Sequence, residues 1–165
     1  MAEETRERVL APKGSAITIN LGGQSVNAFA AAHHSGAGPG LLLISDSNAL
    51  DAGIETRANL FGQEGYSVLA VPNRLSTSDI VEAAQILRDL PASEDKIAAV
   101  AHGDGAMLAL QAATDAKLEA VIAFDVMPLA GENKILDTVA CPFVLQYGIK
   151  DAPDAEALVA NLQDG

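Results

Sequence analysis

The chain has 165 residues, of which 49% are hydrophobic and 4% aromatic, and its formal net charge at pH 7 is −12. The length and the apolar content predict a single domain, 1–165, with a substantial core and a flexible polar leader at 1–13. The acidic charge and the few aromatic side chains argue against nucleic acid and anionic membranes as partners, because both attract clustered Lys and Arg.

Strand patterns recur along most of the chain. Ser15–Leu21 alternates polar and apolar side chains, and a Gly-Gly pair joins it to 25–33, which predicts a β-hairpin. Five short apolar runs then alternate with helical segments; they cover 40–45, 66–71, 96–101, 120–124 and 142–147. Continuous apolarity is typical of strands buried on both faces of a parallel sheet. We therefore predict an α/β fold, a mostly parallel doubly wound sheet with an N-terminal antiparallel hairpin.

The helical segments between these runs have recognisable ends. Asp51 is placed to cap the helix that follows it. Ser76, with Asp79 three residues later, resembles a capping box. After the last apolar run, Pro153 opens a further helical segment at 154–163.

Residues 96–106, KIAAVAHGDGA, form the most informative motif. An apolar strand meets a turn of small residues that opens into a helix, which is the layout of a nucleophile elbow. Ala101 and Gly105 fill the two positions that must be small, and Gly103 stands where Ser, Cys or Asp would attack. The motif predicts an elbow without a nucleophile. Glycine would also relieve the backbone strain of the turn, which costs about 1–3 kcal/mol for other residues.

The order of these elements resembles the dienelactone hydrolase family of the α/β-hydrolase superfamily over nearly the whole chain. The quoted motif is similar to the family's elbow, and GPGLLLISDSNALDAGIETRANLFGQEGYSVLAVPN is similar to its first half. CPFVLQYGIKD is similar to a later strand that ends in Gly-x-x-Asp. The resemblance implies that Gly103 holds the nucleophile position, Asp151 the position of the triad acid, and Asp46 an acidic position after the first parallel strand.

The chain departs from the family pattern in three places. Gly103 replaces the nucleophile. The stretch between Val71 and Asp79 is short where the family carries a long segment that walls the active site. The chain continues only to Gly165, and the family's catalytic His would lie beyond a further helix and strand after Asp151. We therefore expect a truncated α/β-hydrolase-like fold that lacks two members of the triad.

Two side chains beside Gly103 are candidates to replace the nucleophile. Asp104 in that role would place His102 where the elbow demands a small side chain, so Asp104 is better explained as an acid that favours the start of a helix. His102 is interpreted as a packing or hydrogen-bonding residue. The sequence therefore assigns no catalytic residue and leaves Asp104 and His102 as candidates.

Polar side chains gather where the predicted parallel strands end; these are Asp46, Asp104, Asp125 and Asp151, together with His102. Oxygen-rich strand ends can bind a divalent cation. Free amides at the start of the elbow helix could instead hold a small anion, although the acids oppose it. Because the spacing matches no metal motif, neither a metal nor a cofactor is predicted, and ion binding stays an alternative.

Three further reactive side chains are expected away from this site. His33 and His34 end the hairpin strand and are interpreted as surface residues. Cys141 precedes a strand and is interpreted as a buried structural thiol. As the only cysteine, it cannot form an internal disulfide, which fits a reducing compartment. No apolar run approaches the ~18–20 residues of a membrane-spanning helix, and no secretory signal opens the chain, so we expect a cytoplasmic protein without membrane insertion.

These observations favour a catalytically degenerate dienelactone hydrolase-like protein that acts as a binding or structural subunit of an oligomer or larger complex. The strand from Pro142 to Tyr147 is expected at or near a sheet edge with one face less covered, and such a surface needs a protein partner. The alternative is an active hydrolase of esters or lactones that uses a non-standard catalytic residue or one supplied by a partner.

Overall fold

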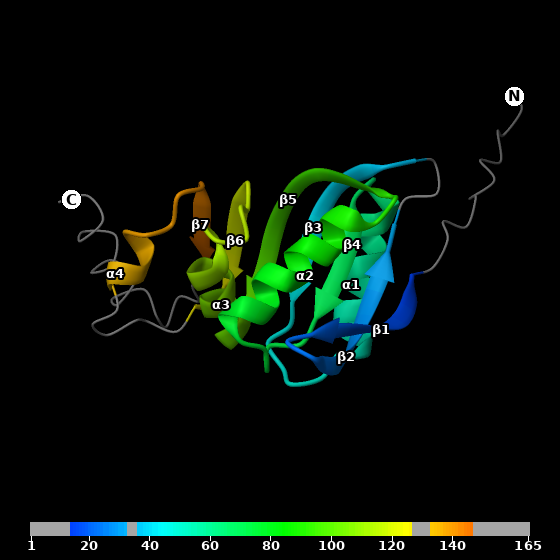
Figure 1. Ribbon diagram of the computed structural model, residues 1–165, viewed down its shortest axis with the longest axis horizontal. Coiled ribbons are helices and arrows are strands. Elements are labelled where there is room, and N and C mark those ends of the chain that lie inside the picture. The colour runs from blue at the N-terminus through cyan, green and yellow to red at the C-terminus, as the bar shows by residue number, and fades with distance from the viewer. Residues whose placement is uncertain (1–13, 33–35, 127–132, 147–165) are drawn as a thin grey trace, which may run out of the picture.

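The computed structural model describes residues 14–32, 36–126 and 133–146, and they form one mixed sheet in the order β1-β2-β4-β3-β5-β6-β7 (Figure 1). The strands are β1 Ser15–Leu21, β2 Gln24–Ala31, β3 Gly38–Ile44, β4 Ser67–Val71, β5 Ser93–His102, β6 Ala120–Phe124 and β7 Phe143–Gln146. The helices are α1 Ala52–Gln63, α2 Thr77–Asp89, α3 Asp104–Ala112 and α4 Asn133–Leu136. The predicted leader at 1–13 lies outside the described residues.

The sheet directions confirm the predicted fold class. β1 and β2 form an antiparallel hairpin, and β2 also pairs antiparallel with β4. β4, β3, β5, β6 and β7 run parallel to one another. The chain is therefore α/β, with a mostly parallel sheet and an antiparallel hairpin at one end.

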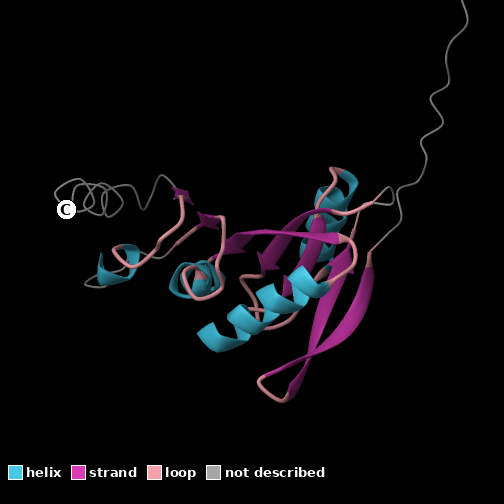
Figure 2. Ribbon diagram, turned by 45° about the horizontal axis from the view of Figure 1, so that its top comes forward, coloured by secondary structure: helices cyan, strands magenta, loops and turns pink. Residues whose placement is uncertain are grey.

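Helices cover the two faces of the sheet and create two apolar cores. The larger core lies between the sheet and the pair α2 and α3, and the smaller lies between the sheet and α1 (Figures 1 and 2). Every residue of β4 is buried, as are residues 40–44 of β3. Burial on both faces explains why these strands read as continuous apolar runs.

The two helix starts predicted at Asp51 and Ser76 are confirmed, whereas the helical segment predicted at 154–163 lies outside the described residues. The Asp51 carboxylate accepts a hydrogen bond of 2.9 Å from the Ile54 amide at the start of α1. In the capping box of α2, the Asp79 amide donates to Ser76 Oγ at 3.2 Å, and the Ser76 amide donates to the Asp79 carboxylate at 2.9 Å. These contacts satisfy amides that the first turns of the helices leave free.

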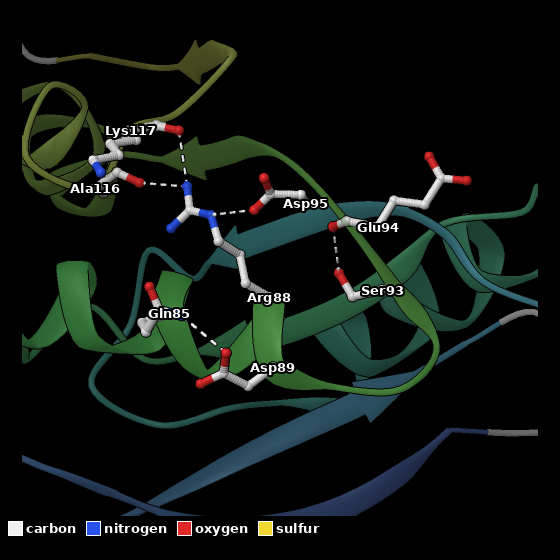
Figure 3. Close-up of polar contacts among 8 residues, drawn as sticks. All are labelled: Gln85, Arg88, Asp89, Ser93, Glu94, Asp95, Ala116 and Lys117. Atoms are coloured by element: carbon white, nitrogen blue, oxygen red, sulfur yellow. Dashed lines mark hydrogen bonds and ion pairs between the residues drawn. The ribbon is translucent and has the colours of Figure 1, made fainter.

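Arg88 connects the end of α2 to the turn that follows α3 (Figure 3). Its Nη2 donates to the backbone oxygen of Ala116 at 2.6 Å and to that of Lys117 at 2.8 Å. Its Nε lies 3.6 Å from the carboxylate of Asp95, which is almost fully exposed. One guanidinium therefore holds the two helices of the larger core at a defined spacing.

The strand order places the elbow at a point where the direction of the connections reverses. The chain passes from β3 through α1 to β4 on one side, and β5 then pairs with the opposite side of β3. The order therefore reverses between β3 and β5, and in open α/β sheets ligands bind outside the carboxyl ends of the strands at such a point. β5 ends at this point in the predicted elbow.

Candidate functional site

Gly103 forms a sharp turn between β5 and α3. Its φ is 54° and its ψ is −127°, a combination that side-chain-bearing residues rarely adopt. Its amide donates to the backbone oxygen of Phe124 at 2.9 Å, which ties the turn to β6. The structure therefore has the strand-turn-helix geometry of an elbow, with Gly103 at its centre.

The two flanking positions are crowded. Ala101 is fully buried in β5, between Ile44 of β3 and Ala123 of β6. A Cβ added to Gly105 would lie 2.6 Å from the backbone oxygen of Ser45. Both positions must therefore be small, as the elbow pattern predicts.

The centre of the turn has more room than its flanks. A Cβ added to Gly103 would lie 3.4 Å from Cβ of Asp46, which is ordinary van der Waals contact. A side chain would therefore fit at position 103 without a clash, but the backbone conformation there would be strained for any residue other than glycine. A side chain placed there would lie next to Asp46, at the carboxyl ends of β3 and β5.

His102 is the half-buried imidazole of the site. It stacks on Phe124, with ring centroids 4.9 Å apart and planes inclined by 15°. Its Nε2 lies 2.9 Å from Nη1 of Arg57, on α1. A guanidinium can only donate, so Nε2 accepts and the ring proton belongs on Nδ1. Nδ1 is buried and has no hydrogen-bond partner among the described residues.

The surroundings of His102 keep its imidazole neutral. Burial is the main cause that lowers its pKa below 6.5, and the positive charge of Arg57 lowers it further. Asp46 and Asp125 oppose this shift in part. A neutral ring fixed by Arg57 and Phe124 agrees with the interpretation of His102 as a packing and hydrogen-bonding residue.

The predicted acids meet at the same edge of the sheet but do not form a metal centre. Asp46 follows β3, Asp104 begins α3 and Asp125 follows β6, and all three are exposed. Asp125 has a φ of 52°, and its amide donates to the backbone oxygen of Gln146 at 2.8 Å. Within the described ranges, no group of three or more His, Cys, Asp or Glu side chains could hold a metal ion. Asp151 lies outside the described residues.

The remaining predicted side chains do not contribute to the described site. Cys141 precedes β7 at the opposite edge of the sheet, where burial raises the pKa of its thiol. It packs against the larger core but is half-buried, not fully buried as predicted. His33 and His34 lie outside the described residues. In the part of the chain that the structure describes, no helix is long and apolar enough to cross a membrane.

Solved hydrolase structures superimpose on most of the chain. A dienelactone hydrolase from Anabaena variabilis has a TM-score of 0.74 and 18% identity, covering 91% of this chain and 79% of its own. The chain has a dienelactone hydrolase-like α/β-hydrolase fold. A dienelactone hydrolase-like promiscuous phosphotriesterase from metagenomic libraries has a TM-score of 0.70 and 16% identity, covering 91% of this chain and 78% of its own. The esterase domain of a Rhodothermus marinus protein has a TM-score of 0.69 and 13% identity, and the match covers 88% of this chain and 82% of that domain's chain.

Comparison by sequence adds nothing to this assignment, because no protein-family model and no curated protein matches the chain. The dienelactone hydrolase-like fold thus rests on structural likeness.

Sequence reasoning missed one neighbour of His102 in this dienelactone hydrolase-like fold. Arg57 lies 45 positions before it in the chain, on a different element, and no local pattern links the two. The stacking of Phe124 could have been foreseen, because His102 and Phe124 end neighbouring predicted strands and are paired in the sheet.

Proposed function

We propose that this chain is a catalytically degenerate dienelactone hydrolase-like protein that acts by binding or assembly. The observation that carries the proposal is Gly103, which occupies the centre of an intact elbow without a side chain to attack a substrate. Nucleophilic catalysis in this fold needs a Ser, Cys or Asp at that position. The turn therefore keeps its shape without its reactive group.

The neighbours of Gly103 are poorly placed to take over its role. Asp104 is already the first residue of α3, so it lies one step beyond the turn. Moving the centre of the turn to Asp104 would put His102 in a position that must be small. The imidazole of His102 accepts from Arg57 and is stacked on a ring, which restrains it from moving toward a substrate.

The free side of β7 supports a role in assembly. Among the described strands, β7 pairs only with β6 and stands at the end of the sheet. An unpaired edge offers backbone donors and acceptors to another chain, and native proteins rarely leave such an edge open. We infer that the stretch from Pro142 to Tyr147 contacts a protein partner, either a second copy of the chain or a subunit of a larger complex.

Hydrolysis assays test the loss of catalysis. Purified protein is incubated with activated esters and lactones, and the rate is compared with those of Asp104→Asn and Asp151→Asn. The expected result is the same background rate for all three proteins, because neither acid attacks a carbonyl. Saturable turnover that either substitution abolishes would overturn the proposal of degeneracy.

Light scattering after size-exclusion chromatography tests the assembly. We expect a stable oligomer or, in extracts of the native cell, a larger complex that contains the chain. A stable monomer that also elutes alone from extracts would contradict the assembly role, whatever the hydrolysis assay shows.

A further inference from the structure

A polar pocket lies between the β1–β2 hairpin, the start of α1 and the loops that follow β3 and β4. Its volume is about 590 Å³, within the range of about 300–1,000 Å³ that is usual for small-molecule sites. We call it the hairpin pocket, and its polar lining consists of Thr18, Asn27, Asn48, Glu55 and Arg74. His102, Gly103 and Asp46 do not line it, so the hairpin pocket is separate from the elbow.

The hairpin supplies a polar floor. Ile17 and Ile19 of β1 pack against the larger core, and successive side chains of a strand point to opposite faces, so Thr18 points to the side of the sheet that α1 covers. Asn27 of β2 is paired with Thr18, and paired side chains share a face. A hydroxyl and an amide therefore lie side by side on this floor, and both side chains are exposed.

Hydrogen bonds hold the two loops of the hairpin pocket together. The backbone amide of Asn73 donates to the backbone oxygen of Ser47 at 3.1 Å, and its Nδ2 donates to the backbone oxygen of Asp46 at 2.8 Å. These bonds tie the loop that carries Asn48 to the loop that carries Arg74. The walls of the pocket are therefore fixed before a ligand enters, which lowers the cost of binding.

Two opposite charges line the hairpin pocket without pairing. Glu55 lies in the first turn of α1 and is half-buried, and Arg74 follows β4 and is exposed. Among the described residues, the ion pair of the structure joins Arg88 to Asp95, so Glu55 and Arg74 pair neither with each other nor with another charge. One carboxylate and one guanidinium are thus available to a ligand in the same pocket.

The lining narrows the class of that ligand. Glu55 and the net charge of −12 oppose a ligand with only negative charge, and Arg74 opposes one with only positive charge. No aromatic side chain lines the hairpin pocket, so a planar ring would have nothing to stack on. Leu50 and Pro72 give the pocket an apolar wall that suits an aliphatic group. A small zwitterion with an aliphatic side chain meets all of these conditions.

We propose that the hairpin pocket binds a free aliphatic amino acid. Arg74 receives the carboxylate, because a guanidinium donates two parallel hydrogen bonds to a carboxylate. Glu55 accepts from the ammonium group, and the aliphatic side chain contacts Leu50 and Pro72. This binding goes beyond the proposed function, since it uses no residue of the elbow and holds whether or not the elbow is catalytic.

NMR titration with leucine and two of its analogues tests the ligand class. Isopentylamine lacks the carboxylate of leucine, and isocaproate lacks its ammonium group. We expect leucine to shift the amide signals of Thr18, Asn27 and Asn48 saturably, and to bind roughly tenfold or more tightly than either analogue. No saturable binding of leucine, equal binding of all three compounds, or shifts centred on Gly103 would overturn the proposal.

Matched charge substitutions test the two anchors by isothermal titration calorimetry with leucine. Glu55→Gln and Arg74→Gln should each weaken binding by roughly tenfold or more. Glu64→Gln, just after α1, and Lys96→Gln, in β5, remove the same charges from exposed side chains outside the pocket and should leave the affinity unchanged. Circular dichroism checks that each variant is folded. Unchanged affinity in Glu55→Gln or Arg74→Gln, or an equal loss in the two controls, would contradict the assigned contacts.

Discussion

Alanine at the centre of the elbow should destabilise the protein by a predictable amount. The backbone of Gly103 has φ 54° and ψ −127°, and such a conformation costs a side-chain-bearing residue about 1–3 kcal/mol. Replacing glycine also restricts the unfolded chain, which offsets about 0.4–1 kcal/mol. Steric overlap adds little, because the new Cβ would lie 3.4 Å from Cβ of Asp46. The free energy of unfolding should therefore fall by about 1–2 kcal/mol in Gly103→Ala.

Urea denaturation of two comparison variants separates strain from crowding. In Gly105→Ala the added Cβ would lie 2.7 Å from Cγ2 of Ile44, so this variant should lose more, about 3 kcal/mol. Gly23 has a φ of 79°, and a Cβ added to it would meet no other side chain or backbone atom within 4 Å, so Gly23→Ala reports strain alone. With a slope of about 2 kcal/mol per molar urea, within the usual range of about 1–3, Gly103→Ala should lower the midpoint by about 0.5–1 M. An unchanged or higher midpoint would refute the assignment of a strained turn.

Three further results are expected. NMR titration should place the pKa of His102 in the native protein below 6.5, and Arg57→Gln should raise that pKa. Because the lowered pKa makes the folded state bind fewer protons than the unfolded state, His102 should contribute stability above pH 6.5 that is lost as the pH falls through its folded pKa. An unshifted titration of His102 would contradict this. Arg88→Ala should cost about 1–3 kcal/mol in thermal unfolding because it strands two backbone oxygens, whereas Asp95→Asn should be nearly neutral since that carboxylate is exposed. Ser76→Ala should cost about 1 kcal/mol in urea denaturation through loss of the capping box, and a neutral effect would count against that contact.

Elements whose signals are local could be predicted from the sequence. Continuous apolar runs identified the parallel strands, because burial on both faces leaves no alternation. Ser76 and Asp79 identified the start of α2, because a capping box lies within four residues. The turn at Gly103 followed from the small residues around it, since crowding at Gly105 leaves no space for a side chain.

Features that depend on distant parts of the chain could not be predicted in this way. The contact between Arg57 and His102 joins α1 to the end of β5, and only the packing of the helix on the sheet brings them together. The ties between Arg88 and the turn after α3 also cross between elements. Likewise, the sequence predicted a strand from Pro142 to Tyr147 with one less-covered face. Only the structure shows which face is exposed, through the paired side chains of Ile122 and Val144.

Trapping an acyl-enzyme tests the loss of the nucleophile most directly. The protein is mixed rapidly with p-nitrophenyl acetate, quenched in acid, digested with trypsin and analysed by mass spectrometry, with attention to the peptide 97–117 that contains the elbow. An elbow centred on Gly103 predicts that this peptide keeps its unmodified mass at every time point. An acetyl group on 97–117 that accumulates and decays during turnover would contradict catalytic degeneracy.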